Sequence, residues 1–472
     1  MCITLSLLRG IFVTEEIDML SKLLEEAKQR KETAETSVAS DYDGPSFNIQ
    51  TFNAISPIGL QKFPEGKYKI SADADGELGG EPHAILLRSH KLQVEEVKPS
   101  VRAIARCGAG TNNIPVEKMS EMGIPVFNTP GANANAVKEL VICSLLLASR
   151  GISEGIQHVK TNIIPEENSE YAAIAKRIEK DKKMFVGQEL TGKTLGVIGL
   201  GHIGSRVVGA ALSLGMKVVG YDPALSLEAA WRLPGDQMTR AKNIEELYKA
   251  SDYISLHVPY IKDKTHHLIN AEALSMCKPG VSICNFARGE IVDGAALRAA
   301  YESGKMTGKY VSDFADADLM GHPQHLVLPH LGASTAEAEE NSAAMAAEQI
   351  IDFLETGSIR NSVNFPDARL EPKEADSYRL CIVNENHPGV LGSITTFLGE
   401  EGINIDQQIN LSRGNVAYTV IDLEKLPSDP EGLQNKLGKI EGILSSRFIG
   451  FPFHTEVGRP GTFFHVSWYQ ES

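Results

Sequence analysis

The sequence has few cysteines, and none of them are in a CxxC pair. Six cysteines occur in 472 residues, and apolar residues surround them. They are Cys2, Cys107, Cys143, Cys277, Cys284 and Cys381. This usage argues against a disulfide framework and indicates free thiols in a reducing compartment. The cytoplasm is therefore the expected location, with targeting to an organelle left open.

The sequence also lacks an excess of positive charge. Lys and Arg number 46 against 61 Asp and Glu, which gives a net charge of −15. Nucleic-acid binders need a basic surface that neutralises phosphates, so this class is excluded as a partner. The same balance argues against an anionic membrane surface, and no apolar run reaches transmembrane length. A small anionic ligand stays compatible, because a pocket can be locally basic.

The N-terminus lacks the features of a secretory signal. Its apolar start, MCITLSLLRGIFV, has one positive charge, Arg9, inside the run, and acidic residues follow at once. A signal peptide is not expected, whereas a transit peptide is not excluded. We interpret residues 1–46 as an N-terminal extension with a solvated helix over 14–40. The tail, 451–472, shows no periodicity and receives no role.

The remaining sequence alternates between strand and helix patterns. Short apolar segments alternate with helical ones over 48–150, and more strongly over 190–335, which predicts parallel sheets covered by helices. Residues 378–450 have the order βαββαβ, after a polar linker at 367–377. The length fits two or three domains. The predicted fold class is therefore α/β with a small separate C-terminal domain.

The segment GLGHIG places Gly199, Gly201 and Gly204 in GxGxxG spacing between an apolar strand and a helix. The first glycine permits a tight turn, the second lets a pyrophosphate approach the backbone, and the third lets helix and strand pack closely. The helix N-terminus attracts phosphate. Asp222, at the end of the next strand, can bond a ribose 2′-hydroxyl and would repel a 2′-phosphate. The motif therefore predicts NAD as cofactor.

Two basic side chains follow later strands. Arg288, in NFARGEIVD, lies where open parallel sheets bind ligands and could hold a carboxylate with two parallel bonds. The alternative is a surface arginine paired with Glu290 or Asp293. His330, before the turn LGAST, could take a hydroxyl proton near neutral pH. A metal site joining His330 to the HPQH segment at 322–325 is not expected, because that segment lacks the spacing of zinc motifs.

These residues resemble the D-isomer-specific 2-hydroxyacid dehydrogenase family. The matching stretches include GTNNIP, PVFNTPGANANAVKEL, GKTLGVIGLGHIG, NFARGEIVD, PHLGAST and NENHPGVLGSITTFLGEEGINI. The resemblance implies a Rossmann-type NAD domain, 156–334, inserted in a flavodoxin-like substrate domain formed by 47–155 and 335–366. It also implies a regulatory ACT domain at 377–450. The active site would lie in the cleft between the first two domains.

The resemblance implies a catalytic set of Arg288, His330 and a carboxylate that orients the histidine. Arg288 would bind the substrate carboxylate and polarise the C2 oxygen, and His330 would be the acid/base group. The family places glutamate where this sequence has Asp318. Aspartate is shorter by one methylene, so Asp316 or a water molecule could take its place. A weaker orienting group would reduce the ~10²–10⁴-fold typical of acid–base catalysis.

Further roles follow from the resemblance alone. The implied cofactor contacts, besides the three motif glycines and Asp222, are His202, Ile203, His257, Pro259, Ala287, Asp313 and Gly332. The implied substrate contacts are Arg88, Ser89, Gly108, Ala109, Gly110 and Lys138. Arg106 is a further basic residue on such a loop, and plain salt bridges are the alternative for Lys138 and Arg106. The implied contacts for serine as effector are Asn384, Asn386 and Asn404, with simple dimerisation as the alternative role of the ACT domain.

The resemblance is greatest to the branch that oxidises 3-phospho-D-glycerate to 3-phosphohydroxypyruvate with NAD, the first step of serine synthesis. A homodimer or homotetramer is expected. Two alternatives stay open. One is a dehydrogenase of another 2-hydroxy acid, such as glycerate or lactate. The other is a non-catalytic NAD-sensing binding protein, of the kind that the family's corepressors represent.

Overall fold

The computed structural model describes residues 47–71, 80–371, 378–425, 427–450 and 465–466. The N-terminal extension and all but two residues of the tail lie outside these ranges. The chain forms two compact units, Met1–Asn128 with Ala343–Ser472, and Thr129–Ser342. The segment 156–334, where we expected the NAD domain, lies within the second unit.

The first unit contains a five-stranded domain, built from 47–128 and 343–371. All its strands are parallel, in the order β2-β1-β3-β4-β5. They are β1 (Phe47–Phe52), β2 (Tyr68–Ile70), β3 (Ala84–Leu87), β4 (Ala103–Arg106) and β5 (Val126–Phe127). Short helical segments connect them: α2 (Pro57–Leu60), η1 (Val94–Glu96) and α3 (Val116–Glu121). The sequence pattern of alternating strands and helices is confirmed here.

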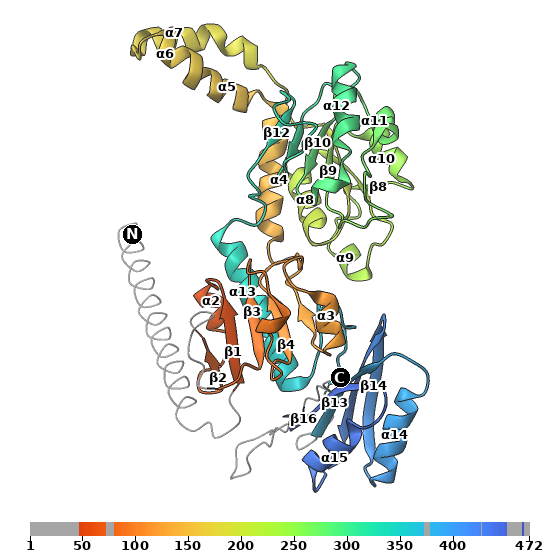
Figure 1. The fold of residues 1–472 in the computed structure, drawn as a ribbon. Coiled ribbons are helices and arrows are strands. Elements are labelled where there is room, and N and C mark those ends of the chain that lie inside the picture. Colours follow the sequence, from red (N-terminus) through yellow and green to blue (C-terminus); the bar gives the residue numbers. More distant parts are fainter. Residues whose placement is uncertain (1–46, 72–79, 372–377, 426, 451–464, 467–472) are drawn as a thin grey trace, which may run out of the picture. The chain divides into compact units, whose positions relative to one another are not determined.

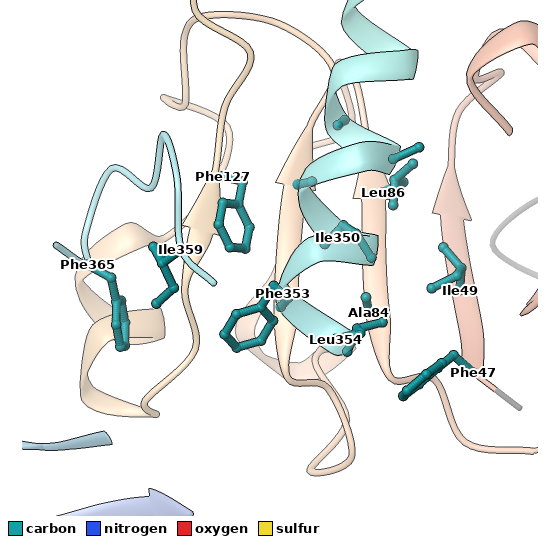
Figure 2. Close-up of a cluster of buried hydrophobic side chains, with 14 of the residues drawn as sticks. Phe47, Ile49, Ala84, Leu86, Phe127, Ile350, Phe353, Leu354, Ile359 and Phe365 are labelled. Carbon is teal, nitrogen blue, oxygen red and sulfur yellow. The ribbon is translucent and has the colours of Figure 1, made fainter. Parts of the chain in front are cut away.

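A long helix, α13 (Ala336–Thr356), covers one face of this sheet. Figure 2 shows Ile350, Phe353 and Leu354 of α13 beside strand residues such as Leu86 and Phe127. All five side chains are almost completely buried. Each such side chain contributes roughly 1.5–3 kcal/mol when it leaves water. The returning chain therefore completes the core of the five-stranded domain.

The first unit also contains the C-terminal domain (residues 378–450), which has the predicted βαββαβ order. Its strands are antiparallel, in the order β14-β15-β13-β16, and the two-residue β17 (His465–Val466) pairs with β16. The other elements are β13 (Tyr378–Glu385), α14 (Val390–Glu400), β14 (Ile405–Arg413), β15 (Val416–Leu423), α15 (Pro430–Leu437) and β16 (Ile443–Gly450).

Both faces of the C-terminal sheet are buried at its middle strands, β13 and β15. Successive strand side chains point to opposite faces, so Leu380 and Ile382 of β13 pack with α14 and α15. Cys381 and Val383, between and after them, belong instead to the core that contains Phe353. The C-terminal sheet and the five-stranded domain therefore share one hydrophobic core.

The second unit contains a parallel sheet of seven strands in the order β12-β11-β10-β9-β6-β7-β8. They are β6 (Thr194–Ile198), β7 (Lys217–Tyr221), β8 (Thr239–Arg240), β9 (Tyr253–Leu256), β10 (Ser282–Asn285), β11 (Tyr310–Ser312) and β12 (His325–Val327). The strand order reverses between β6 and β9. Open sheets bind ligands at such a switch point, outside the carboxyl ends of the strands. This is the predicted Rossmann-type topology.

Helices cover this sheet and form one projection. The helical elements of this domain are α4 (Ala134–Ser149), α8 (His202–Ser213), α9 (Leu227–Trp231), α10 (Ile244–Ala250), α11 (Ala271–Met276), η4 (Gly289–Ile291) and α12 (Gly294–Glu302). The projection consists of α5 (Ile152–His158), η2 (Val159–Ile163), α6 (Ile164–Glu166), α7 (Tyr171–Asp181) and η3 (Lys182–Phe185). Asn243 and Asp293 cap α10 and α12 by accepting from backbone N–H groups.

Candidate active site

The glycine loop between β6 and α8 has the geometry that a pyrophosphate requires. Gly199 has φ +89°, a conformation that other residues rarely adopt, and its N–H donates to the Tyr221 carbonyl at 2.9 Å. A Cβ on Gly204 would lie 1.9 Å from the Gly199 oxygen, so only glycine lets α8 pack so closely. A Cβ on Gly201 would meet nothing within 4 Å, so space remains beside the loop. These features fit a dinucleotide at the N-terminus of α8.

Asp222 follows β7 and lies against this loop. Its Oδ2 accepts from the Leu200 N–H and its Oδ1 from the Ala224 N–H, both at 2.9 Å. A carboxylate can accept about four hydrogen bonds, so it can still accept from a ribose hydroxyl. The carboxylate thus has two roles, since it orders the glycine loop and offers a negative charge beside it.

Asp313 follows β11, and one of its carboxylate oxygens is buried without a hydrogen-bond donor among the described residues. Its side chain is 5% exposed, and Oδ2 accepts from the Gly332 N–H at 2.7 Å. Its Oδ1 is buried and has no partner among the described residues. An unsatisfied buried carboxylate oxygen is costly, so a ligand donor is expected there. The carboxamide of a nicotinamide has the required N–H group.

His257, after β9, is held as a neutral side chain. Its ring Nε2 lies 2.8 Å from Ser255 Oγ, and burial lowers the pKa of its imidazole to about 3. A histidine with this pKa carries no positive charge near neutral pH and keeps a single ring N–H. His257 therefore contributes a neutral polar side chain at the sheet edge. Pro259, two residues later, is exposed.

Arg288 follows β10, and the buried side-chain amide of Asn285 holds its backbone in place. Asn285, fully buried, donates from Nδ2 to the Arg288 carbonyl at 2.8 Å. The Arg288 Nη1 donates to the Ala287 carbonyl at 2.7 Å. Within the described part of the second unit, its guanidinium forms no ion pair, and Asp293 instead caps α12. The remaining N–H groups of the Arg288 guanidinium can therefore donate to a planar anion. Sequence reasoning missed Asn285, although a polar residue ending a buried strand was a usable signal.

His330 occupies a strained and exposed position after β12. Its φ is +56°, and its ring meets Phe314 edge-on with centroids 5.3 Å apart. Left-handed φ values in non-glycine residues collect at functional sites. Its ring nitrogens make no hydrogen bond within the described ranges of the unit. The ring therefore stays accessible to a ligand.

The structure does not bring Asp318 into a hydrogen bond with His330. The Asp318 N–H donates to Asp316 Oδ1 at 2.9 Å, and its carbonyl accepts from Arg298 at 2.9 Å. The Asp316 carboxylate lies against Gly294, at the start of α12. The orienting role of Asp318 stays a prediction.

The other two loop histidines have structural contacts. His325 stacks on Tyr310, bonds Ser312 Oγ at 3.0 Å, and has its pKa lowered by burial. His322 stacks on Tyr301 with centroids 4.8 Å apart. Among the residues that the structure describes, no three side chains of His, Cys, Asp or Glu form a group that could hold a metal ion.

A basic cluster lies at the carboxyl edge of the five-stranded sheet. The Arg106 Nε donates to the Arg88 carbonyl at 3.1 Å. Burial raises the pKa of the Cys107 thiol to about 12, and the charges of Arg106 and Arg88 act to lower it, so both guanidiniums lie close by. Asn53, with φ +70°, accepts from the Ser89 N–H at 3.0 Å and so fixes that loop.

The remaining substrate candidates differ in their surroundings. The Ala109 carbonyl accepts from Asn128 Nδ2 at 2.6 Å, which fixes the glycine segment, and Gly108 has φ +156°. Lys138 belongs to the second unit and lies 3.3 Å from Glu139 in an exposed ion pair. Asn53 and Asn128 were missed from the sequence, although both follow strands.

The three effector candidates occupy different environments. Asn384 is 2% exposed, and its amide bonds Thr419 Oγ1 at 3.0 Å and the Glu385 carbonyl at 2.9 Å. Asn386 lines a groove of about 780 Å³ with His387 and Arg413. Asn404 is exposed and donates to Glu424 at 3.3 Å. Within this chain, therefore, only Asn386 of the three reaches the groove.

No helix among the described residues is both long and apolar enough to cross a membrane.

Comparisons with known proteins agree with this architecture. The profile described as D-isomer specific 2-hydroxyacid dehydrogenase, NAD binding domain, matches residues 143–332. D-3-phosphoglycerate dehydrogenase of Haemophilus influenzae is 32% identical over 397 residues, which are 81% of this chain and 90% of that protein. The enzyme of the same name from Escherichia coli strain K12 is 33% identical over 380 residues, 78% of this chain and 87% of that protein.

A solved structure extends the comparison to the fold. The NAD⁺-bound 3-phosphoglycerate dehydrogenase of Entamoeba histolytica matches with a TM-score of 0.51 and 28% identity, covering 68% of this chain and 99% of that chain. The glycine loop, the buried Asp313 carboxylate and the strand order give these likenesses a physical basis. The chain belongs to the D-isomer specific 2-hydroxyacid dehydrogenase family and is an NAD-dependent member of it.

Proposed function

We propose that the protein oxidises 3-phospho-D-glycerate to 3-phosphohydroxypyruvate. The observation that carries the proposal is the Arg88–Arg106 cluster, which lies at the carboxyl edge of the five-stranded sheet. Guanidinium groups match the oxygens of a phosphate through their fork of donors. The relatives named D-3-phosphoglycerate dehydrogenase, which align over most of the chain, support the same substrate.

Each catalytic role falls to a residue with suitable chemistry. Arg288 binds the substrate carboxylate and polarises the C2 oxygen, while Arg88 and Ser89 bind the phosphate. Bound NAD supplies the hydride acceptor. As the C2–H bond breaks, His330 takes the hydroxyl proton and the C2–O bond becomes a carbonyl. The Gly108–Gly110 backbone also holds the carboxylate, and Lys138 adds positive charge.

We also propose serine as an effector of the C-terminal domain. Asn386 and its groove offer donors and acceptors for an amino acid, with Arg413 as a partner for its carboxylate. Asn404 would complete the site from a second copy in a homodimer or homotetramer. Asn384, whose amide is bonded internally, would support the site by fixing the end of β13.

The test compares two substrates that differ by the phosphate. NADH oxidation is measured with 3-phosphohydroxypyruvate and with hydroxypyruvate, for wild type and Arg88→Ala. Arg360→Ala, which removes an exposed arginine of the same unit, is the matched control. We expect Arg88→Ala to lower kcat/KM for the phosphorylated substrate by roughly 10–100-fold, since a charged hydrogen bond contributes about 1.5–3 kcal/mol.

Three outcomes would contradict parts of the proposal. Equal losses on both substrates would remove the phosphate assignment. Turnover of hydroxypyruvate alone would indicate another 2-hydroxy acid as substrate. Tight NADH binding without turnover of any 2-oxo acid would indicate a non-catalytic NAD sensor. Serine added to the same assay, with Asn386→Ala as comparison, tests the effector site.

A further inference from the structure

A cavity of about 690 Å³ lies where the C-terminal domain meets the five-stranded domain, within the first unit. Its walls are mixed, with an apolar part that includes Met122, Ile124, Phe353, Val383 and Leu444. Two arginines, Arg102 and Arg447, also line it. The volume lies in the range of ~300–1,000 Å³ typical of small-molecule sites. None of the residues assigned above to cofactor, substrate or serine lines this cavity.

Arg102 is a half-buried cation, and one of its side-chain nitrogens is enclosed without a hydrogen-bond partner among the described residues. It precedes β4, and its backbone N–H donates to the His83 carbonyl at 2.8 Å. Its side-chain Nε is buried and has no hydrogen-bond partner among the described residues. Burial, and then the charge of Arg447, lower the pKa of its guanidinium to about 9. The group therefore still carries its charge at neutral pH.

Arg447 lies on β16 and is 7% exposed. It donates to the carbonyls of Leu354, at 3.1 Å, and Phe353, in the last turn of α13. Its Cζ lies 4.2 Å from the centre of the Phe353 ring. These contacts fix the guanidinium at the helix end and use part of its donor set, because a guanidinium carries five N–H groups.

The described residues provide no counterion for this pair. No carboxylate in the described ranges lies within ion-pair distance of either guanidinium. Glu121, which also lines the cavity, pairs with Lys118 at 2.8 Å. Glu95 and Lys98 line it as well. Buried charges in proteins are normally paired, so two adjacent cations beside a cavity indicate an anionic ligand.

We propose that this cavity binds a small organic anion, a carboxylate or phosphate monoester with an apolar body, whose oxygens accept from Arg102 and Arg447. The forked donors of the two guanidiniums suit a planar or tetrahedral oxyanion. The cavity is much larger than the oxyanion alone, and its apolar wall fits the rest of such a molecule. Because the ligand would contact β16 and the start of β4, it would join the C-terminal domain to the five-stranded domain.

The test uses the full-length protein saturated with NADH, at constant ionic strength. Thermal unfolding is followed with phenyl phosphate, benzoate, inorganic phosphate and phenol as probes. At about 100 times its Kd, a ligand of the folded state should raise Tm by a few degrees. We expect a rise with phenyl phosphate or benzoate, a smaller one with inorganic phosphate, and none with phenol. Which of the first two acts more strongly identifies the headgroup as phosphate or carboxylate.

Two variants locate the effect. Arg102→Met should abolish the rise, whereas Arg88→Ala, at the proposed substrate phosphate site, should retain it. Arg102→Met should also unfold at or above the wild-type Tm without any probe, since it removes a half-buried charge with an unsatisfied Nε. Arg102→Gln serves if the methionine variant does not fold. Arg447 is not substituted, because it caps α13.

The inference is overturned if no anion raises the wild-type Tm, or if Arg102→Met responds like wild type. It is also overturned if Arg88→Ala alone loses the response, because the anion would then occupy the substrate site. A failure of 3-phosphohydroxypyruvate turnover would leave this result unaffected, so the two proposals are tested separately.

Discussion

The buried ion pair between Arg379 and Asp422 gives the sharpest stability prediction. Both side chains are 0% exposed, and the guanidinium donates from Nε and Nη2 to the two carboxylate oxygens at 2.6 and 2.9 Å. A third donor, Nη1, reaches the Thr356 carbonyl at the end of α13 at 2.7 Å. Asp422 Oδ2 also accepts from Gln407 at 2.7 Å. Each charge therefore has the other as its counterion, and each also has a neutral hydrogen-bond partner.

Asp422→Ala leaves the Arg379 charge buried and without its counterion. Removal of one partner of such a pair costs about 3–5 kcal/mol of unfolding free energy. At 1.4 kcal/mol per tenfold, the unfolded fraction of the C-terminal domain should rise by roughly 100- to 4,000-fold. The measurement is amide hydrogen exchange of β13 and β15, which reports the opening of this domain separately from the rest of the chain.

Glu302→Ala is the matched control, because Arg298–Glu302 is an exposed pair on one helix with a similar distance, 2.8 Å. It should leave the exchange of its own helix nearly unchanged, since exposed pairs stabilise little. The double variant Arg379→Met with Asp422→Leu should recover most of the loss, because apolar residues of similar volume can replace a buried pair. The reasoning is refuted if Asp422→Ala behaves like Glu302→Ala, or if the double variant is as unstable as the single one.

Three further predictions concern the second unit. His330→Asn should lower kcat by about 10²–10⁴-fold, and Asp318→Asn should lower it much less, since no bond joins the two side chains; equal losses in stopped-flow NADH oxidation would contradict this. Asp222→Asn should weaken NAD binding and reduce the preference over NADP, as measured by calorimetry with both cofactors; an unchanged ratio would count against the ribose contact. His257 has a pKa of about 3 in the folded state against 6.5 ordinarily, so the unfolded state binds the extra proton between these values. The unfolding free energy should therefore fall with decreasing pH in that window, by up to about 1.4 kcal/mol per pH unit. Urea denaturation at several pH values measures this slope, which should be smaller in His257→Gln.

The sequence predicted features that depend on local patterns. The GLGHIG glycines, the strand before them and Asp222 are within one short segment, so their geometry follows from turn and packing requirements. The positions of Arg288 and His330 after strands were also predictable, because parallel strands present their carboxyl ends at one edge. The βαββαβ order could be obtained from periodicity in the same way.

Features that depend on distant surfaces could not be predicted. Periodicity shows that Cys381 and Leu380 point to opposite faces, but it does not show that the five-stranded domain covers one of them. Arg102 and Arg447 are far apart in sequence, and nothing in either local pattern indicates that they share a cavity. The internal bonds of Asn384 likewise depend on Thr419 of the neighbouring strand.

The shared core of the C-terminal and five-stranded domains has a consequence for experiments on regulation. A chain shortened after residue 371 would uncover Phe353 and Ile359, which are now buried, and would leave the last carbonyls of α13 without the donors of Arg379 and Arg447. Such a protein would expose an apolar surface and would therefore be prone to aggregate. Lost activity after truncation would therefore reflect the disrupted core of the five-stranded domain rather than the removal of a regulatory domain. Point substitutions in the Asn386 groove separate effects on regulation from effects on folding more clearly than a truncation does.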